Sequence, residues 1–289
     1  MNNKKIERVW ILNHHAKGNG GRHDELARHL NKLGVKVVII ASSFNNSTYE
    51  YKYKEKYLVK EINDKLTYVW LRTSPKYFGN GIKRILNMIS YMFMAKRRSK
   101  EWFKLYGKPD AVIGSSVHPF AWEAAYSIAK KANADFYAEV RDLWPLSLVE
   151  VQGINEKHPL VKFFGILEKR AYKRSKKIIT TMPYAYKFIM EKYGYPRNKI
   201  EWIANGIDTN VIDEALKNKE NKLPEDLSDY LQNNWCAVYT GSFVKSECVD
   251  FILEAAEILQ KRNKNIKFAI VGSGHMKSKL LEMKKEKGL

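Results

Sequence analysis

Short apolar runs alternate with helical patterns along the first two thirds of the chain. The runs predict strands at residues 9–12, 35–40, 66–71, 136–140, 177–181 and 200–203, and another begins at Ala111. Apolar residues at helical spacing lie at residues 26–33, 82–106, 119–129 and 183–192. A strand, a helix and a second strand joined by a short return predict a parallel βαβ unit. The pattern therefore indicates an α/β fold.

The clearest passage from strand to helix lies at residues 111–129. The apolar run breaks at small residues, presents His118 and enters an alanine-rich helix through Pro119, which suits the first helical position. This places His118 at the carboxyl end of a strand, where open α/β sheets bind ligands. A histidine that only caps the helix or fills the loop is the alternative.

A second pattern of the same kind begins at Trp235. A strand at 235–240 turns at Gly241 and Ser242, and a helix, a strand at 266–271 and a glycine loop with Gly272 and Gly274 follow. The charged stretch 217–234 predicts a linker. We expect a first domain at 1–216 and a second, incomplete one at 235–289, because two strands and two helices cannot close a doubly wound domain.

The loop after the first strand contains Gly18, Gly20 and Gly21, whose spacing fits neither a dinucleotide fingerprint nor a P-loop. Its glycines can still let backbone amides approach an anion at a helix amino terminus. A plain flexible turn is the alternative interpretation.

The formal charge of +20 predicts attraction to nucleic acid, anionic lipid or phosphorylated ligands. The lysines are spread over most of the chain, which explains part of the excess without any partner. No nucleic-acid-binding motif gathers them, so no nucleic-acid partner is expected. The two cysteines lack a ligand pattern, and the amino terminus lacks a signal-peptide pattern, which favours a cytoplasmic location.

The helical stretch 82–106 combines an apolar run with basic flanks, including Lys96, Arg97 and Arg98. The run is too short to span a bilayer. Its flanks and aromatic content suit a helix that lies on an anionic membrane surface. This interpretation predicts peripheral attachment at the inner face of the cell membrane. A core helix with solvated ends is the alternative.

The chain resembles the retaining glycosyltransferases of family 4, which have the GT-B fold of two Rossmann-like domains with a central cleft. The residues that carry the resemblance are Gly20-Gly21, His118, the run at 139–145, the Asn-Gly-x-Asp motif at 205–208, the Tyr-Thr-Gly at 239–241 and the loop at 271–274. The run Arg-Asp-Leu-Trp-Pro at 141–145 looks most like members that build bacterial surface polysaccharides, such as lipopolysaccharide or capsule.

The resemblance implies a role for each matching residue. His118 and Lys245 would be catalytic, His118 bonding the transferred sugar and Lys245 offsetting the charge of the leaving group. No metal and no cofactor would then be needed, and the nucleotide-sugar donor, UDP-linked, would be a substrate. Donor-binding residues would be Gly20, Gly21, Asn205, Gly241, Ser242, Gly272 and Gly274, and acceptor-side residues Arg22, His23, Arg141, Asp142 and Trp144.

One feature of the family is missing from the sequence. Members carry paired glutamates beyond the second glycine loop, and Glu282 and Glu286 do not match them. The resemblance therefore implies a carboxyl-truncated hexosyltransferase, inactive as it stands, for a lipid-linked or polysaccharide acceptor. A non-catalytic acceptor-binding or assembly module is the second hypothesis, and a basic nucleic-acid binder is the weakest.

Overall fold

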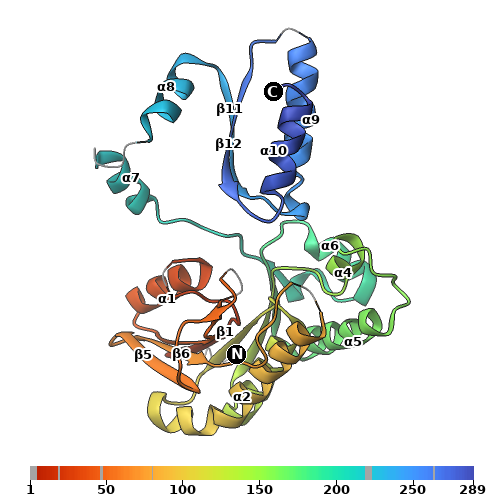
Figure 1. Cartoon of the computed structure of the whole chain (residues 1–289). Helices are drawn as coiled ribbons and strands as arrows, with labels where there is room; N and C mark the ends of the chain where they lie inside the picture. The colour runs from red at the N-terminus through yellow and green to blue at the C-terminus, as the bar shows by residue number, and fades with distance from the viewer. Residues whose placement is uncertain (1–4, 19, 46–47, 80, 219–222, 263) are drawn as a thin grey trace. The chain divides into compact units, whose positions relative to one another are not determined.

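The computed structural model describes residues 5–18, 20–45, 48–79, 81–218, 223–262 and 264–289. The chain divides into two compact units, Met1–Ile207 and Asp208–Leu289 (Figure 1). Within the stretch expected to be a linker, residues 219–222 lie outside the described part, and helix α8 occupies Glu225–Asn233.

The first unit is built on an eight-stranded sheet with the order β10-β9-β8-β7-β1-β2-β6-β5. Every neighbouring pair is parallel except β5 with β6, which is antiparallel. The strands are β1 (Arg8–Leu12), β2 (Lys36–Ser42), β5 (Tyr57–Asn63), β6 (Leu66–Leu71), β7 (Ala111–Ser115), β8 (Asp135–Val140), β9 (Lys177–Thr180) and β10 (Ile200–Trp202). A short hairpin joins β3 (Phe44–Asn45) to β4 (Glu50–Tyr51).

Helices cover both faces of this sheet, because successive strand residues point to opposite sides. Trp10 and Leu12 belong to a core shared with α2 and α3, whereas Val9 and Ile11 belong to a second core shared with α1. The helices are α1 (Arg22–Lys32), α2 (Ile82–Tyr106), α3 (Pro119–Ala132), α4 (Leu146–Glu150), α5 (Pro159–Arg174) and α6 (Ala185–Tyr193). A 3-10 turn at Arg197–Lys199 precedes β10.

The chain changes direction across the sheet at β1, which lies between β2 and β7. Ligands of open α/β sheets bind at such a point, beyond the carboxyl ends of the strands. His118 follows β7 and is the N-cap of α3, with Pro119 in the first turn. The predicted strand, loop and helix around His118 are confirmed.

The second unit pairs β11 (Cys236–Ser242) with β12 (Lys267–Ser273) in parallel, with Gly241 opposite Gly272. Between them the chain passes through a 3-10 turn at Lys245–Glu247 and α9 (Val249–Lys261), and α10 (Lys277–Glu286) follows β12. Helix α7 (Thr209–Lys217) and α8 precede the sheet. Phe243, Leu253 and Leu280 form part of its small core.

Several elements of the first unit have no counterpart in the sequence-based prediction, and helix α5 and strand β5 are the longest of them. Helix α5 packs Val161 and Phe164 against Met88 of α2. Strand β5 is antiparallel and pairs along the outside of β6, and its second half is exposed. The α/β class and the repeated strand, glycine and helix pattern are confirmed.

Candidate active site

Three neighbouring strands bring the functional side chains of the first unit together. Leu12 of β1 pairs with Gly114 of β7, which pairs with Ala138 of β8. The residues that follow these positions therefore share one edge of the sheet. They include Asn13 and His14 after β1, and residues 116–118 after β7.

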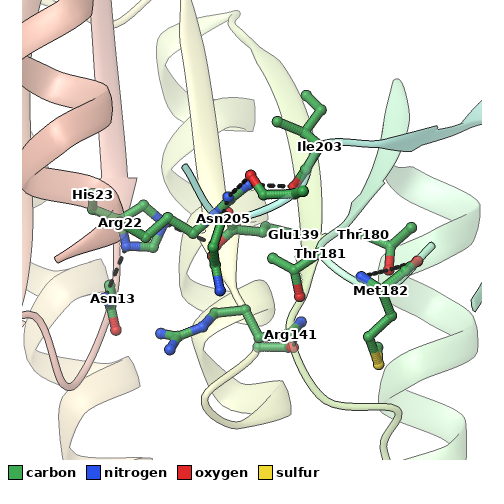
Figure 2. Close-up of polar contacts among 12 residues, drawn as sticks. Asn13, Arg22, His23, Glu139, Arg141, Thr180, Thr181, Met182, Ile203 and Asn205 are labelled. Atoms are coloured by element: carbon green, nitrogen blue, oxygen red, sulfur yellow. Dashed lines mark hydrogen bonds and ion pairs between the residues drawn. The ribbon is translucent and has the colours of Figure 1, made fainter. Parts of the chain in front are cut away.

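Glu139, near the end of β8, is the centre of a buried polar network (Figure 2). Arg22 Nε donates to one carboxylate oxygen at 2.7 Å, and His23 Nε2 lies 2.8 Å from the other. The amide nitrogen of Asn13 lies 2.8 Å from His23 Nδ1. Because an amide nitrogen only donates, His23 Nδ1 accepts, and its Nε2–H donates to Glu139.

The partners of Glu139 keep it ionised although it is buried. Burial alone would raise the pKa of this carboxyl, but the hydrogen bonds of His23 and Arg22 and the charge of Arg22 lower it to about 2. The carboxylate is therefore negative throughout the neutral range and holds α1 against the end of β8.

Arg22 also fixes the chain after β10. Its Nη1 donates to the carbonyl of Ala204 at 2.8 Å and to Asn205 Oδ1 at 3.3 Å, and its Nη2 donates to the carbonyl of Ile203 at 3.1 Å (Figure 2). The structure thus brings together Arg22 and His23, predicted on the acceptor side, with Asn205, predicted to bind donor.

A buried histidine cluster lies beside this network. His118 Nε2 and His14 Nδ1 are 2.8 Å apart, and the ring of His14 lies 4.7 Å from those of His15 and Tyr91. The Tyr91 hydroxyl donates to the carbonyl of Ile40 at 2.6 Å, which ties α2 to the end of β2. His118 is completely buried, so in this structure it contacts protein groups.

All three imidazoles are neutral at physiological pH. Burial, followed by neighbouring positive charges, lowers the pKa of His14 and His118 well below the usual value and that of His15 to about 3. They can serve as neutral hydrogen-bonding groups, each with one donating and one accepting nitrogen.

The loop after β8 places its charged residues differently from its tryptophan. The backbone amide of Arg141 donates to Ser116 Oγ at 2.8 Å, while the Arg141 side chain is exposed. Asp142 is also exposed. Trp144 is 6% exposed, donates from its indole to the carbonyl of Ser116 at 3.1 Å and packs against Phe164, so it holds the loop in place.

The predicted donor-binding residues of the second unit also lie together, at the carboxyl ends of β11 and β12. A side chain at Gly272 would meet the carbonyl oxygen of Gly241 at 1.9 Å, and one at Gly274 would meet that of Phe243 at 2.3 Å. Only glycine fits there. Ser242 lies opposite Ser273, and Lys245 follows within the next turn with an exposed side chain.

The glycines of the first loop leave the amino end of α1 open. Gly20 and Gly21 have φ angles of 98° and 127°, and a Cβ atom at Gly20 would meet nothing within 4 Å. Positive φ of this kind favours glycine. Backbone amides are accessible there, beside the acidic first-turn residues Asp24 and Glu25.

Sequence reasoning did not select Glu139, Asn13, His14 or His15 as site residues. Glu139 was part of the matched run, and a carboxylate at the end of a predicted strand could have been paired with Arg22 and His23. The two adjacent histidines after the first strand carried a similar signal, because that strand adjoins the one leading to His118.

The fold and the family model define a glycosyltransferase with the GT-B fold. The chain belongs to Glycosyltransferase Family 4, whose family model matches residues 23–211. No curated protein matches the chain.

Similar solved structures share the fold at low sequence identity. The structure described as trehalose-6-phosphate from E. coli bound with UDP-2-fluoro glucose has a TM-score of 0.66 and 10% identity, covering 97% of this chain and 69% of that one. A glycosyltransferase from Rickettsia africae has a TM-score of 0.56 and 17% identity, covering 99% and 66%. Anabaena HepE in complex with UDP and glucose has a TM-score of 0.56 and 11% identity, covering 98% and 67%. The chain thus spans about two thirds of their length.

Proposed function

We propose that the chain transfers a hexose from a UDP-linked nucleotide sugar to a lipid-linked or polysaccharide acceptor in cell-surface glycan synthesis, with retention of configuration. Family membership supports glycosyl transfer. The observation that carries the donor half is the glycine-lined end of β11 and β12. Two structures of the same fold hold UDP or a UDP-sugar, which favours the same donor class here.

In this proposal the second unit binds the diphosphate of the donor. Gly241, Gly272 and Gly274 let backbone amides approach the phosphate oxygens, and Ser242 adds a hydroxyl. As the bond between the anomeric carbon and the diphosphate breaks, negative charge develops on the leaving group. The Lys245 ammonium offsets that charge, so the reaction requires no metal.

The first unit supplies the acceptor-side residues and part of the donor site in the same proposal. His118 bonds the transferred sugar, and Gly20 and Gly21 let their loop approach the donor diphosphate. Since His118 is buried in this structure, its contact with a sugar requires the loops around it to open. Arg22 links this side to Asn205.

We further propose that the reaction takes place at the cytoplasmic face of a membrane. Ile82, Leu86 and Phe93 on α2 are 76%, 49% and 60% exposed, and Arg97 and Lys100 continue the same face. An apolar stripe followed by basic residues suits an anionic bilayer surface. No helix in the described part of the chain is long and apolar enough to cross a membrane.

A non-catalytic acceptor-binding module is the second candidate. The sheet of the second unit contains two strands within the described residues, whereas sheets that bind nucleotides in this type of fold are larger. We therefore expect the chain to hold the donor weakly and to transfer sugar slowly or not at all.

The test measures donor binding and transfer separately. UDP-glucose binding is followed by calorimetry, and transfer to a prenyl-diphosphate-linked sugar is followed by mass spectrometry. Where transfer is found, with or without a supplied downstream segment, His118→Ala and Lys245→Ala should lower its rate about 100-fold or more. Lys285→Ala, on the exposed face of α10, is the control.

Each outcome decides between the candidates. Absence of both donor binding and transfer under all conditions supports the acceptor-binding module. Transfer that is indifferent to both substitutions shows that the catalytic residues are wrong.

A further inference from the structure

Basic side chains from three separate elements converge on the histidine cluster. His15 follows β1, Arg141 follows β8, and Arg84 lies on α2. The first two are near each other because β1 and β8 both flank β7. Ser116, at the end of β7, holds the backbone of Arg141 at 2.8 Å.

Helical spacing brings Arg84 to the same place. Arg84 precedes Tyr91 by about two turns and therefore lies on the same face of α2. Asn87 and Tyr91 of this face are buried, and the Tyr91 ring lies 4.7 Å from that of His14 and 5.8 Å from that of His118. Arg84 thus extends the buried face of α2 at the edge where the strands end.

Several nitrogen atoms in this cluster have no protein partner. Both ring nitrogens of His15 and Nδ1 of His118 are buried and make no hydrogen bond with the described residues. The Arg141 guanidinium is exposed and has no hydrogen bond or ion pair with the residues drawn in Figure 2. Buried polar groups without a partner are unfavourable and rare, which points to a ligand.

The cluster is also electropositive. The charges of Arg84, Arg141 and Lys17 all reach the ring of His15 and, after burial, lower its pKa. Asp142 is a carboxyl group whose surroundings include Arg141 and Arg84. An anion bound beside these cations would relieve their mutual repulsion and supply hydrogen-bond acceptors.

We propose that this cluster of His15, Arg84 and Arg141 binds a phosphoryl group of the acceptor, and we call it the acceptor anion site. The inference rests on the proposed function and names the chemistry of its acceptor: a phosphate or diphosphate ester. Two guanidinium groups suit the planar recognition of phosphate oxygens. Under the proposed function the donor diphosphate contacts the glycine-bearing loops and Lys245, so the two anions have different partners.

The first experiment measures binding of inorganic pyrophosphate by calorimetry at low salt, with no donor and no turnover. Arg84→Gln and Arg141→Gln should each weaken binding about 10-fold to 100-fold, because each removes a charge-assisted hydrogen bond. Arg141→Lys should retain part of the affinity. Lys130→Gln, exposed at the far end of α3, is the control and should leave binding unchanged.

Three outcomes would overturn the acceptor anion site. One is equal binding by the wild type and both glutamine variants. Another is an equal loss in Lys130→Gln, which would indicate attraction to the overall charge. The third is that UDP displaces pyrophosphate and that Arg84→Gln and Arg141→Gln weaken UDP binding as much as they weaken pyrophosphate binding. This result would assign the cluster to the donor.

A second readout does not depend on affinity. Phosphate bound beside His15 should raise the pKa of its imidazole, which is followed by nuclear magnetic resonance during a pH titration with and without pyrophosphate. His15→Gln identifies the signal. Arg141 is exposed, and circular dichroism spectra of its variants establish that they fold.

Matched pairs of probes then separate the sources of the phosphoryl group. Farnesyl diphosphate is compared with farnesol, and glucose 6-phosphate with glucose. Tighter binding of farnesyl diphosphate than of farnesol assigns a lipid-linked acceptor. Tighter binding of glucose 6-phosphate than of glucose assigns a soluble sugar phosphate. Binding at this site with no transfer from any nucleotide sugar would overturn the proposed function alone, whereas transfer to neutral acceptors only would overturn the anion site alone.

Discussion

Single residues of this protein illustrate how burial and partners set opposite charge states for the same side chain. Glu139 and Glu168 are both carboxyl groups inside the first unit, 1% and 0% exposed. Glu139 has two cationic or cation-forming partners, Arg22 and His23, and stays ionised. Glu168 has the hydroxyls of Tyr172 and Tyr193, which donate to it without bringing charge.

Replacing Glu139 should remove an acid-sensitive part of the stability. Its pKa is lowered from 4.5 to about 2, so its contribution is present above about pH 4.5 and is lost as the pH falls toward 2. Glu139→Gln should lower the free energy of unfolding at pH 7 by roughly 3 kcal/mol, and the difference should shrink below pH 4.5. Urea denaturation at a series of pH values measures it. Glu201→Gln, which breaks an exposed pair with Lys177, should lower the stability much less, and an equal loss would contradict the assignment.

Glu168 should have the opposite pH dependence. Burial raises its pKa from 4.5 to about 7 against the smaller effect of the tyrosine hydrogen bonds. Its contribution is fully present below about pH 4.5 and is lost as the pH rises through 7. In the wild type the free energy of unfolding should therefore fall between pH 4.5 and 7, as measured by urea denaturation. Glu168→Gln should remove this fall, while Glu191→Gln, at an exposed position, should keep it. A slope that persists in Glu168→Gln would assign it to another group.

The position of a functional side chain was predictable from the sequence only where adjacent residues or a family motif indicated it. His118 before Pro119 could be placed at a strand end from local signals. The pairing of Glu139 with Arg22 could not, because these residues are 117 positions apart and meet only through the strand order. The burial of Trp144 depends in the same way on α5, which the sequence analysis did not assign.

At the level of elements, α2 has two distinct faces. One face carries Arg84, Asn87 and Tyr91 toward the strand ends, and the other carries the exposed stripe of Ile82, Leu86 and Phe93. The sequence predicted its bounds because apolar residues recur at helical spacing over its whole length. It left open which residues are exposed: Arg98 pairs with Glu101 at 3.0 Å and lies over the Tyr57 ring.

We expect the exposed face of α2 to bind anionic vesicles. Making Lys96, Arg97 and Arg98 neutral should reduce sedimentation with phosphatidylglycerol vesicles. The double variant Arg97→Gln with Lys100→Gln should reduce it at least as much, since both of these side chains are exposed. Phe93→Ser should reduce binding through the apolar contribution. Lys32→Gln on α1 serves as the control. Binding that is unaffected by the α2 changes would reject this surface.

The bounds of the other elements show which strands and helices the local pattern of apolar residues can predict. Strand 66–71 matches its prediction at both ends, because apolar residues fill it and charged or polar residues flank it. Helix α5 was missed although Val161, Phe164 and Ala171 recur on its buried face, since lysines and exposed Phe163 and Ile166 interrupt the apolar stripe. Strand β5 was missed because half of it is polar.

At the scale of the whole molecule, the repeated strand, glycine and helix pattern was enough to predict an α/β fold with two parallel sheets. The order of strands was not predictable, because β1 could have paired with other strands of similar composition. The order matters most for function, since it places the loops of His14, His118 and Arg141 side by side.

The outer strands of the large sheet bear on how this protein avoids joining to other chains. An unpaired strand edge is a template on which a second molecule can add a strand and begin an aggregate. On one side, β10 contains only three residues, and on the other, β5 carries Lys60 and Glu61 in its exposed half, with an irregular register near Asn63. A short ladder and a charged, interrupted one each offer little to an incoming strand. The polar residues that hid β5 from sequence analysis therefore protect the sheet against edge-to-edge association.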